Sequence, residues 1–368
     1  MTVLKKIYLQ SSLPTGRIIR WVLGIIVSLY LIWRLVDVIF IEKPYGPDTW
    51  LRFAISGLVV GGLYSLIAIG YTLVYGILQM INFAHGDIMM IGCFGGYFVF
   101  EAFKAIPAPG SSSTGLNFLN YQPVLSVIIA FFVGMAVAAL AGYYLEKIAY
   151  RPLRSAPRLI PLISAIGASI FLENAFQLLF GPQKRIYANP DILERGVGWT
   201  INVGGNQVIV TYTGALTFIL SILLMIGLFM LVQHTRLGRS MRAVSQDKKT
   251  ASLMGIDVDD VISKTFIISG ALAGAAGVMF GIHTYGFNYY VGFLPGIKAF
   301  TAAVVGGIGN IPGAMVGGVL LGIIESMGPA ALGLDLQLSD VIAFTILILV
   351  LIFRPSGILG EVLSQEKV

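Results

Sequence analysis

The chain has 368 residues, a formal net charge of +6 and a mean hydropathy of +0.86, and 57% of its residues are apolar whereas only 11% are charged. Because an ordinary soluble domain has about 25% charged residues, this composition excludes a water-soluble globular protein and predicts a chain embedded largely in lipid. The basic residues lie in short stretches between apolar runs, which excludes a nucleic-acid-binding pattern, and the single cysteine, Cys93, excludes an intrachain disulfide or a zinc cluster.

The first apolar run extends from Ile18 to Phe40 and follows a basic segment, residues 1–17. A secretory signal has an apolar core of about 7–15 residues followed by a small-residue cleavage site. This run is longer, contains Arg34 and Asp37, and is followed by no such site. We therefore expect a retained membrane anchor preceded by a cytoplasmic N-terminal segment.

Further apolar runs, several of them near the length of about 20 residues that crosses a bilayer, recur along the chain. They lie at Phe53–Met80, Ile88–Phe103, Pro123–Leu145, Leu159–Phe180, Tyr212–Val232, Thr265–Tyr285 and Val341–Phe353, with a proline-interrupted pair around Pro312. Residues 181–211 are polar, and the alternation over Thr200–Tyr212 predicts a small hairpin. The expected fold class is an all-α polytopic membrane protein with about eight transmembrane helices, a broken or re-entrant helix pair and an extramembrane β-hairpin.

Lysine and arginine gather in two loops, Lys147–Arg158 and residues 234–264. Short cytoplasmic loops retain basic residues during membrane insertion. We therefore expect a transmembrane domain over residues 18–354, with the loop 234–264 and the tail 355–368 in the cytoplasm and the loop 181–211 outside.

Glycine spacing predicts both close packing and breaks in the helices. Many of the 44 glycines stand four residues apart, as Gly57 and Gly61 do, and this spacing is typical of helices in close contact. Irregular backbone at membrane depth is tolerated only within protein or beside a water-filled cavity, so a polar route is expected between two breaks. The first break is Ile81–Gly86, and the second consists of Gly306, Gly307, Gly309, Asn310 and Pro312.

Polar residues in or beside the apolar runs are candidates for a translocation pathway, because ionisable groups in lipid are costly unless they are paired or hydrated. The candidates are Asn82, His85, Asp87, Glu173, Asn174 and Glu325. Two other interpretations stay open. Glu173 could join a hydrogen-bonded cluster between helices, and Asp87 could simply complement a helix N-terminus.

Signatures of catalysis are missing from the sequence. It contains no GxxxxGK[ST] loop, no HExxH pair and no nucleophile elbow. We therefore expect a protein that is not an enzyme and binds no metal, so that any ATP would be hydrolysed by a partner. The segment Arg236–Asp260 is the candidate contact with such a partner, because it combines basic residues with an apolar set that predicts short amphipathic helices.

Six segments carry a family resemblance that spans nearly the whole chain. They are GLVVGGLYSLIAIGYTLVYGILQMINFAHGDIMMIG from Gly57, YRPLRSAPRLIPLISAIGASI from Tyr150, SQDKKTASLMGI from Ser245, the glycine-rich run Gly270–Gly281, AAVVGGIGNIPGAMVGGVLLGIIE from Ala302 and FRPSGILGE from Phe353. Together they resemble the inner-membrane permeases of branched-chain amino acid ABC importers, specifically the H-type subunit.

The resemblance implies a multi-pass permease domain in a bacterial inner membrane, within an importer of branched-chain amino acids. Its implied partners are a second related permease subunit, two ATP-binding cassette ATPase subunits and an extracytoplasmic solute-binding protein. No cofactor would be bound by this chain, because ATP would bind to the ATPase subunits.

Permeases of such importers dock a cytoplasmic loop into the ATPase through a pattern of Glu-Ala-Ala, three residues and Gly. Here the pattern departs from the family at Lys249 and Thr250 but retains Ala251 and Gly255. The coupling residues that the resemblance implies are Arg242, Asp247, Lys249, Thr250, Ala251 and Gly255.

Two alternatives remain at this point. A permease subunit for urea or short-chain amides shares much of the same motif set. A stand-alone channel or ion-driven carrier is favoured by acidic residues within the membrane, Glu173 and Glu325.

Overall fold

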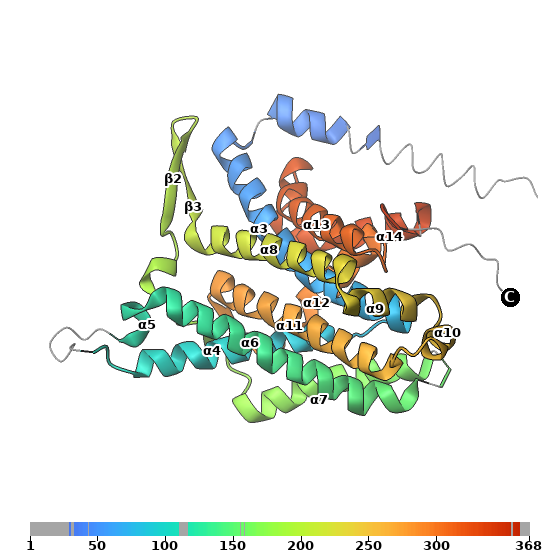
Figure 1. Cartoon of the computed structure of the whole chain (residues 1–368). Helices are drawn as coiled ribbons and strands as arrows, with labels where there is room; N and C mark the ends of the chain where they lie inside the picture. Colours follow the sequence, from blue (N-terminus) through green and yellow to red (C-terminus); the bar gives the residue numbers. More distant parts are fainter. Residues whose placement is uncertain are drawn as a thin grey trace, which may run out of the picture.

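The computed structural model describes residues 29–30, 33–42, 44–109, 117–154, 156–157, 159–354 and 356–360, which form a bundle of long helices (Figure 1). Eight helices in these ranges are long and apolar enough to cross a membrane. They are α3 (Pro47–Leu78), α4 (His85–Ala105), α6 (Pro123–Leu145), α7 (Leu159–Phe180), α8 (Tyr212–His234), α11 (Val258–Thr284), α13 (Ile311–Ala331) and α14 (Ser339–Phe353), some of them prolonged by short 3-10 or π turns.

Shorter elements connect these helices. The apolar helix α12 (Phe293–Gly306) has 14 residues, fewer than a full crossing needs. The others are α5 (Phe118–Tyr121), α9 (Arg236–Gln246), α10 (Lys248–Leu253), the paired strands β1 (Arg185–Ile186) and β4 (Gly286–Phe287), and the hairpin of β2 (Gly198–Val203) and β3 (Asn206–Thr211).

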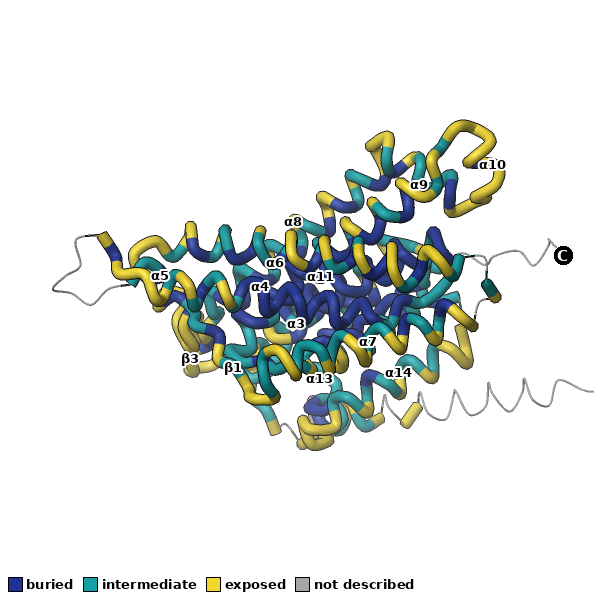
Figure 2. Tube along the Cα trace, turned by 90° about the horizontal axis from the view of Figure 1, so that it is seen from below, coloured by how far each residue is buried: buried dark blue, intermediate teal, exposed yellow. Residues whose placement is uncertain are grey.

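Helices α3, α4 and α11 form the centre of the bundle and are its most buried members (Figure 2). Glycines allow them to approach closely. A Cβ atom on Gly92 of α4 would overlap the backbone of Gly274 on α11, and a Cβ atom on Gly61 of α3 would lie 2.8 Å from the Cα of Val319 on α13. The predicted use of glycine for helix contacts is therefore confirmed.

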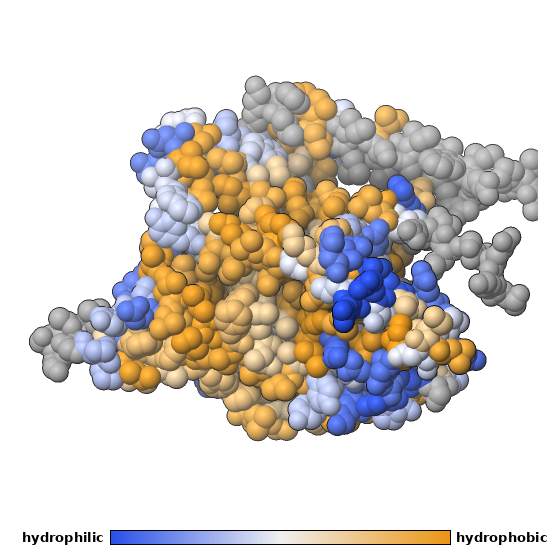
Figure 3. All heavy atoms as spheres, in the orientation of Figure 1, coloured by the Kyte–Doolittle hydropathy of each residue, from blue (hydrophilic) through white to orange (hydrophobic). Residues whose placement is uncertain are grey.

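Polar residues gather at the two ends of the bundle, and apolar side chains cover the flank between them on the face shown in Figure 3. One end, termed the hairpin end, carries α5 and the β2–β3 hairpin (Figure 1). The opposite end, termed the basic end, carries α9, α10 and the turns η2 (Glu146–Tyr150) and η3 (Arg151–Leu153). An apolar band between polar ends is the surface that a lipid bilayer requires.

An ion-pair cluster ties η2 and η3 to the start of α11 at the basic end. The carboxylate of Glu146 is fully buried, pairs with Arg154 and accepts a hydrogen bond of 2.8 Å from the Ser263 hydroxyl. Arg154 and Arg151 both pair with Asp259 on α11. Because a buried carboxylate is costly without a partner, this cluster fixes where the chain leaves the bundle.

The predicted helical membrane fold and the hairpin are confirmed, with two corrections. Helix α11 begins at Val258 rather than Thr265, because the Asp257 side chain accepts a hydrogen bond from the Asp260 amide and caps the helix there. Helix α13 is a full-length crossing rather than half of a broken pair. The first anchor, Ile18–Phe40, and the segment 1–17 lie largely outside the described residues.

Candidate functional site

The backbones of α4 and α12 meet at two glycines inside the bundle. A Cβ atom on Gly86, in the first turn of α4, would overlap the carbonyl group of Gly292, which directly precedes α12. A Cβ atom on Gly292 would in turn overlap the Gly86 carbonyl. A third glycine, Gly296, lies at the same contact, where its Cβ would be 3.0 Å from the Gly86 Cα.

This meeting point is deep in the bundle rather than at either end. Beside Gly86, the His85 ring packs against Gly70 of α3, and the Ser269 hydroxyl near the middle of α11 donates a hydrogen bond of 3.1 Å to the Gly70 carbonyl. Because α3 and α11 each cross the whole bundle, α4 must begin partway through it, after the chain has turned back over Gln79–Ala84. The predicted early break, Ile81–Gly86, therefore reaches from the basic end into the bundle.

Helices α4 and α12 leave the meeting point in opposite directions. Helix α4 ends next to α5 at the hairpin end, whereas α12 ends at Gly306, which is hydrogen-bonded to the segment after α14 at the basic end. Two helix N-termini, each carrying a partial positive charge, are thus directed at one region inside the membrane-crossing part of the protein.

A cavity of about 280 Å³ adjoins this meeting point. It lies between α3, α4, α7 and α12 and is lined by Tyr71, Phe83, Gly86, Asp87, Ile166, Ser169, Ile170, Glu173, Gly292, Phe293, Gly296 and Ile297. Two carboxyl groups among mostly apolar side chains suit it to a small solute with a polar group and an apolar body.

The two carboxylates come from different helices. Asp87 belongs to the first turn of α4 and is 1% exposed, and its Oδ2 has no hydrogen-bonding partner among the described residues. Glu173 of α7 is half-buried, and its Oε1 is likewise unpartnered within that part of the chain. Of the six pathway candidates, the structure brings these two to the same cavity.

Three of the other candidates lie near the cavity but do not line it. His85 is completely buried behind it, with its ring 4.8 Å from that of Tyr71, measured between centroids. Asn82 accepts a hydrogen bond of 2.6 Å from the Tyr150 hydroxyl. Asn174 is on the exposed side of α7, where its side chain donates to the Ile170 carbonyl.

The sixth candidate, Glu325, belongs to a separate ion-pair network between α3, α12, α13 and α14. The ammonium group of Lys298 lies 2.7 Å from Glu325 Oε1 and 2.5 Å from Asp340 Oδ1, and the Tyr64 hydroxyl donates to Glu325 across 3.2 Å. Lys298 is only 5% exposed. Lys298 was not among the candidates predicted from the sequence, although a single lysine in the apolar run from Phe293 to Gly306 indicates a buried charge.

The second predicted break, between Gly306 and Pro312, does separate two helices, but it lies at the end of the bundle and does not meet the first break. Gly306 ends α12, and the side chain of Asn310 caps α13 by accepting a hydrogen bond from the Gly313 amide. This turn lies at the basic end, where the Asn310 amide donates to the carbonyl of Leu359 across 2.7 Å. The break that meets Ile81–Gly86 is instead at Gly292, which the sequence analysis missed.

The segment between α8 and α11 folds into the two short helices expected of it. Asp247 caps α10 by accepting hydrogen bonds from the Lys249 amide, at 2.9 Å, and the Thr250 hydroxyl, at 2.5 Å, and these bonds hold the pKa of its carboxyl below the usual range. Ala251 is buried, whereas Leu253 and Met254 are 86% and 79% exposed. Gly255 has a φ of +84° and ends the helix, and Arg242 donates to the Val232 carbonyl.

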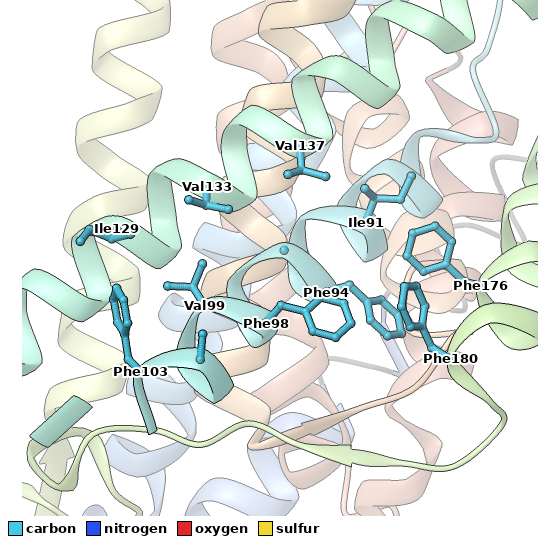
Figure 4. Close-up of a pocket in the computed structure, with 12 residues that line it drawn as sticks. Ile91, Phe94, Phe98, Val99, Phe103, Ile129, Val133, Val137, Phe176 and Phe180 are labelled. Carbon is cyan, nitrogen blue, oxygen red and sulfur yellow. The ribbon is translucent and has the colours of Figure 1, made fainter. Parts of the chain in front are cut away.

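A larger cavity of about 450 Å³ lies between α4, α6 and α7, lined by side chains that are all apolar (Figure 4). Beside it, Phe94 and Phe98 of α4 pack against Phe176 and Phe180 of α7, and Phe94 and Phe180 stack with their ring centroids 5.0 Å apart. A surface without polar groups cannot replace the hydration of a charged solute. This cavity therefore fits lipid chains better than a polar pathway.

Residues 53–351 match the family described as the permease component of branched-chain amino acid transport systems. The chain is 46% identical to the high-affinity branched-chain amino acid transport system permease protein BraD of Pseudomonas aeruginosa, over 85% of this chain and 96% of that protein. It is 43% identical to the corresponding permease protein LivH of Escherichia coli, with the same coverage of both chains.

A more distant relative is a probable branched-chain amino acid transport permease protein of Methanocaldococcus jannaschii, with 30% identity over 83% of this chain and 91% of the relative. No solved structure matches the chain significantly.

Proposed function

The chain belongs to the family of permease components of branched-chain amino acid transport systems, and we propose from this premise that it moves branched-chain amino acids through a bacterial inner membrane. It would do so as one permease subunit of an ATP-binding cassette importer that includes a second, related permease subunit. The identity to BraD and LivH over nearly their whole lengths is the observation that supports this substrate class.

The proposed direction of transport is from the hairpin end to the basic end. The lysines and arginines of residues 147–158 and 234–264 support a cytoplasmic basic end, because such residues are retained on that side during insertion. The segment 181–211, which contains the hairpin, then faces the outside, where a solute-binding protein would deliver substrate.

The meeting of α4 and α12 supports a transport route near the cavity. Two helices that begin inside the membrane, with their N-termini directed at one polar region, are a recurrent arrangement at the binding sites of transporters. Asp87 and Glu173, each with one carboxylate oxygen that has no partner among the described residues, mark the part of the route in which a polar solute would replace water.

Energy for transport would come from two ATPase subunits bound at the basic end. The chain has no phosphate-binding loop of its own. Helices α9 and α10 project at the basic end (Figure 2), and the exposed Leu253 and Met254 give their tip an apolar contact surface. ATP binding would pull on this segment and so tilt α8 and α11, to which it is joined.

Replacing Leu253 with aspartate should weaken binding of the ATPase subunits by about tenfold or more, because an apolar side chain at the centre of a contact contributes about 1–2 kcal/mol or more. The variant should still insert normally, since Leu253 contributes little to the fold when 86% exposed. The measurement is the amount of ATPase that co-purifies with the permease.

Leu253→Met is the matched control, because it keeps an apolar side chain of similar size at the same position. It should retain ATPase binding. Equal ATPase recovery with Leu253→Asp and with the wild type would contradict the assignment of this tip as the coupling surface.

The proposed function as a whole is tested by reconstituting the chain with its co-purifying subunits and binding protein in liposomes. ATP-dependent uptake of leucine, isoleucine or valine that urea does not inhibit would support it. Uptake of urea instead, or concentrative uptake by this chain alone without nucleotide, would refute it.

A further inference from the structure

The cavity at the α4–α12 meeting point has an unbalanced charge. Two carboxylates, Asp87 and Glu173, line it, whereas its described lining includes no basic side chain. Lys298, although it follows Ile297 of the lining, is held by Glu325 and Asp340. Each carboxylate has one buried oxygen without a partner among the described residues, which is costly, so the cavity is suited to a solute that brings a positive charge.

The N-terminus of α12 offers the opposite charge. Gly292 precedes this helix without a side chain to cap it, and its first turn contains no acidic residue. Helix α4, by contrast, already carries Asp87 in its first turn. In that turn the Phe293 N–H already donates to the Tyr290 carbonyl and Pro295 has no N–H, so the Leu294 N–H and the helix dipole are what remain for an anionic group of the solute.

Apart from Ser169 and three glycines, the remaining lining is aliphatic or aromatic. Ile166 and Ile170 of α7 lie one helical turn apart, and Ile297 and Phe293 do so on α12. The cavity thus combines a negative group, a positive helix end and an apolar wall within about 280 Å³. That volume is slightly below the usual range for ligand sites, roughly 300–1,000 Å³, and suits one small molecule.

We propose that this cavity holds one zwitterionic aliphatic amino acid during translocation. Its ammonium group pairs with Asp87 and Glu173, its carboxylate lies at the N-terminus of α12, and its side chain contacts Ile166, Ile170 and Ile297. This inference rests on the proposed function and extends it: the permease itself recognises the charged backbone of its substrate, in addition to any selection by a binding protein.

The first test uses the complete transport complex in proteoliposomes with the double variant Asp87→Asn and Glu173→Gln, which preserves the shapes of both side chains. Uptake of leucine should fall by about tenfold or more, since hydrogen bonds to charged groups are the strong ones. ATP hydrolysis stimulated by the loaded binding protein should persist. Asn174→Ala, adjacent on α7 but exposed, is the matched control and should transport normally.

The second test detects occupancy without transport, so it remains informative if the double variant assembles poorly. Ser169→Cys is placed in a Cys93→Ala background, which leaves one thiol at the cavity. A small cationic thiol reagent should react faster than an anionic one of similar size, and leucine should slow the cationic reaction. Adding Asp87→Asn should remove the charge preference.

The outcomes separate the two proposals. If the wild-type complex takes up no branched-chain amino acid, the proposed function fails. If the wild type transports leucine normally and the double variant does so too, the site is refuted and the function stands. A thiol at residue 169 that does not react, or whose reaction leucine does not slow, also refutes the site.

Discussion

Replacing Lys298 with methionine should destabilise the folded chain by about 3–5 kcal/mol, the effect expected when one partner of a buried ion pair is removed. The substitution keeps an apolar stem of similar length, so the loss comes from the charge. Glu325 would keep only the Tyr64 hydroxyl as a partner, and its side chain is just 16% exposed. Asp340 is 42% exposed and can be hydrated instead.

The measurement is the midpoint of thermal unfolding of the purified chain, together with the amount of protein that accumulates in membranes. Lys264→Met is the matched control. Lys264 pairs with Asp260 at 2.6 Å, but both side chains are about half exposed, and surface pairs of this kind contribute only about 0.3–0.5 kcal/mol.

Adding Glu325→Gln to Lys298→Met should recover part of the lost stability, because the buried negative charge is then removed as well. A decrease in the midpoint no larger for Lys298→Met than for Lys264→Met would contradict the structural role of the network.

The membrane-crossing helices could be predicted because each crossing has to satisfy its backbone internally and present an apolar surface over its whole length. Both constraints are visible in one sequence. The starts of Pro123–Leu145 and Leu159–Phe180 were therefore predicted correctly, whereas Thr265 was chosen for the start of α11 because Asp259, Asp260 and Lys264 make its first two turns look like a loop.

The site could be predicted only in part. Asp87 and Glu173 stood out as ionisable residues in or beside apolar runs, but their meeting at one cavity depends on helices far apart in sequence. Gly292 was missed for a related reason. Glycine is required there because of the contact with Gly86, which no local pattern reveals. The residues that follow, Phe293, Leu294 and Pro295, indicate only that a helix starts nearby.

Replacing Gly292 with alanine should lower uptake by about tenfold or more, because the contact between α4 and α12 has no room for a methyl group. The backbone of Gly292 has φ −77° and ψ −28°, which alanine adopts freely, so strain in the backbone is not involved. The methyl group would instead overlap the Gly86 carbonyl and force the two helix N-termini apart, at a typical cost of about 1–3 kcal/mol for overpacking.

Gly167→Ala in α7 is the matched control, since a Cβ atom at that position has no neighbour within 4 Å, and both variants are compared for ATP-driven uptake and thermal midpoint. Normal uptake by Gly292→Ala would show that the helix contact is not needed for transport. If uptake falls by more than the modest loss of stability explains, the spacing of the two N-termini itself matters for transport. The reason is that the positive end of α12 and the carboxylate of Asp87 can act on one small solute only while the glycine contact holds them together.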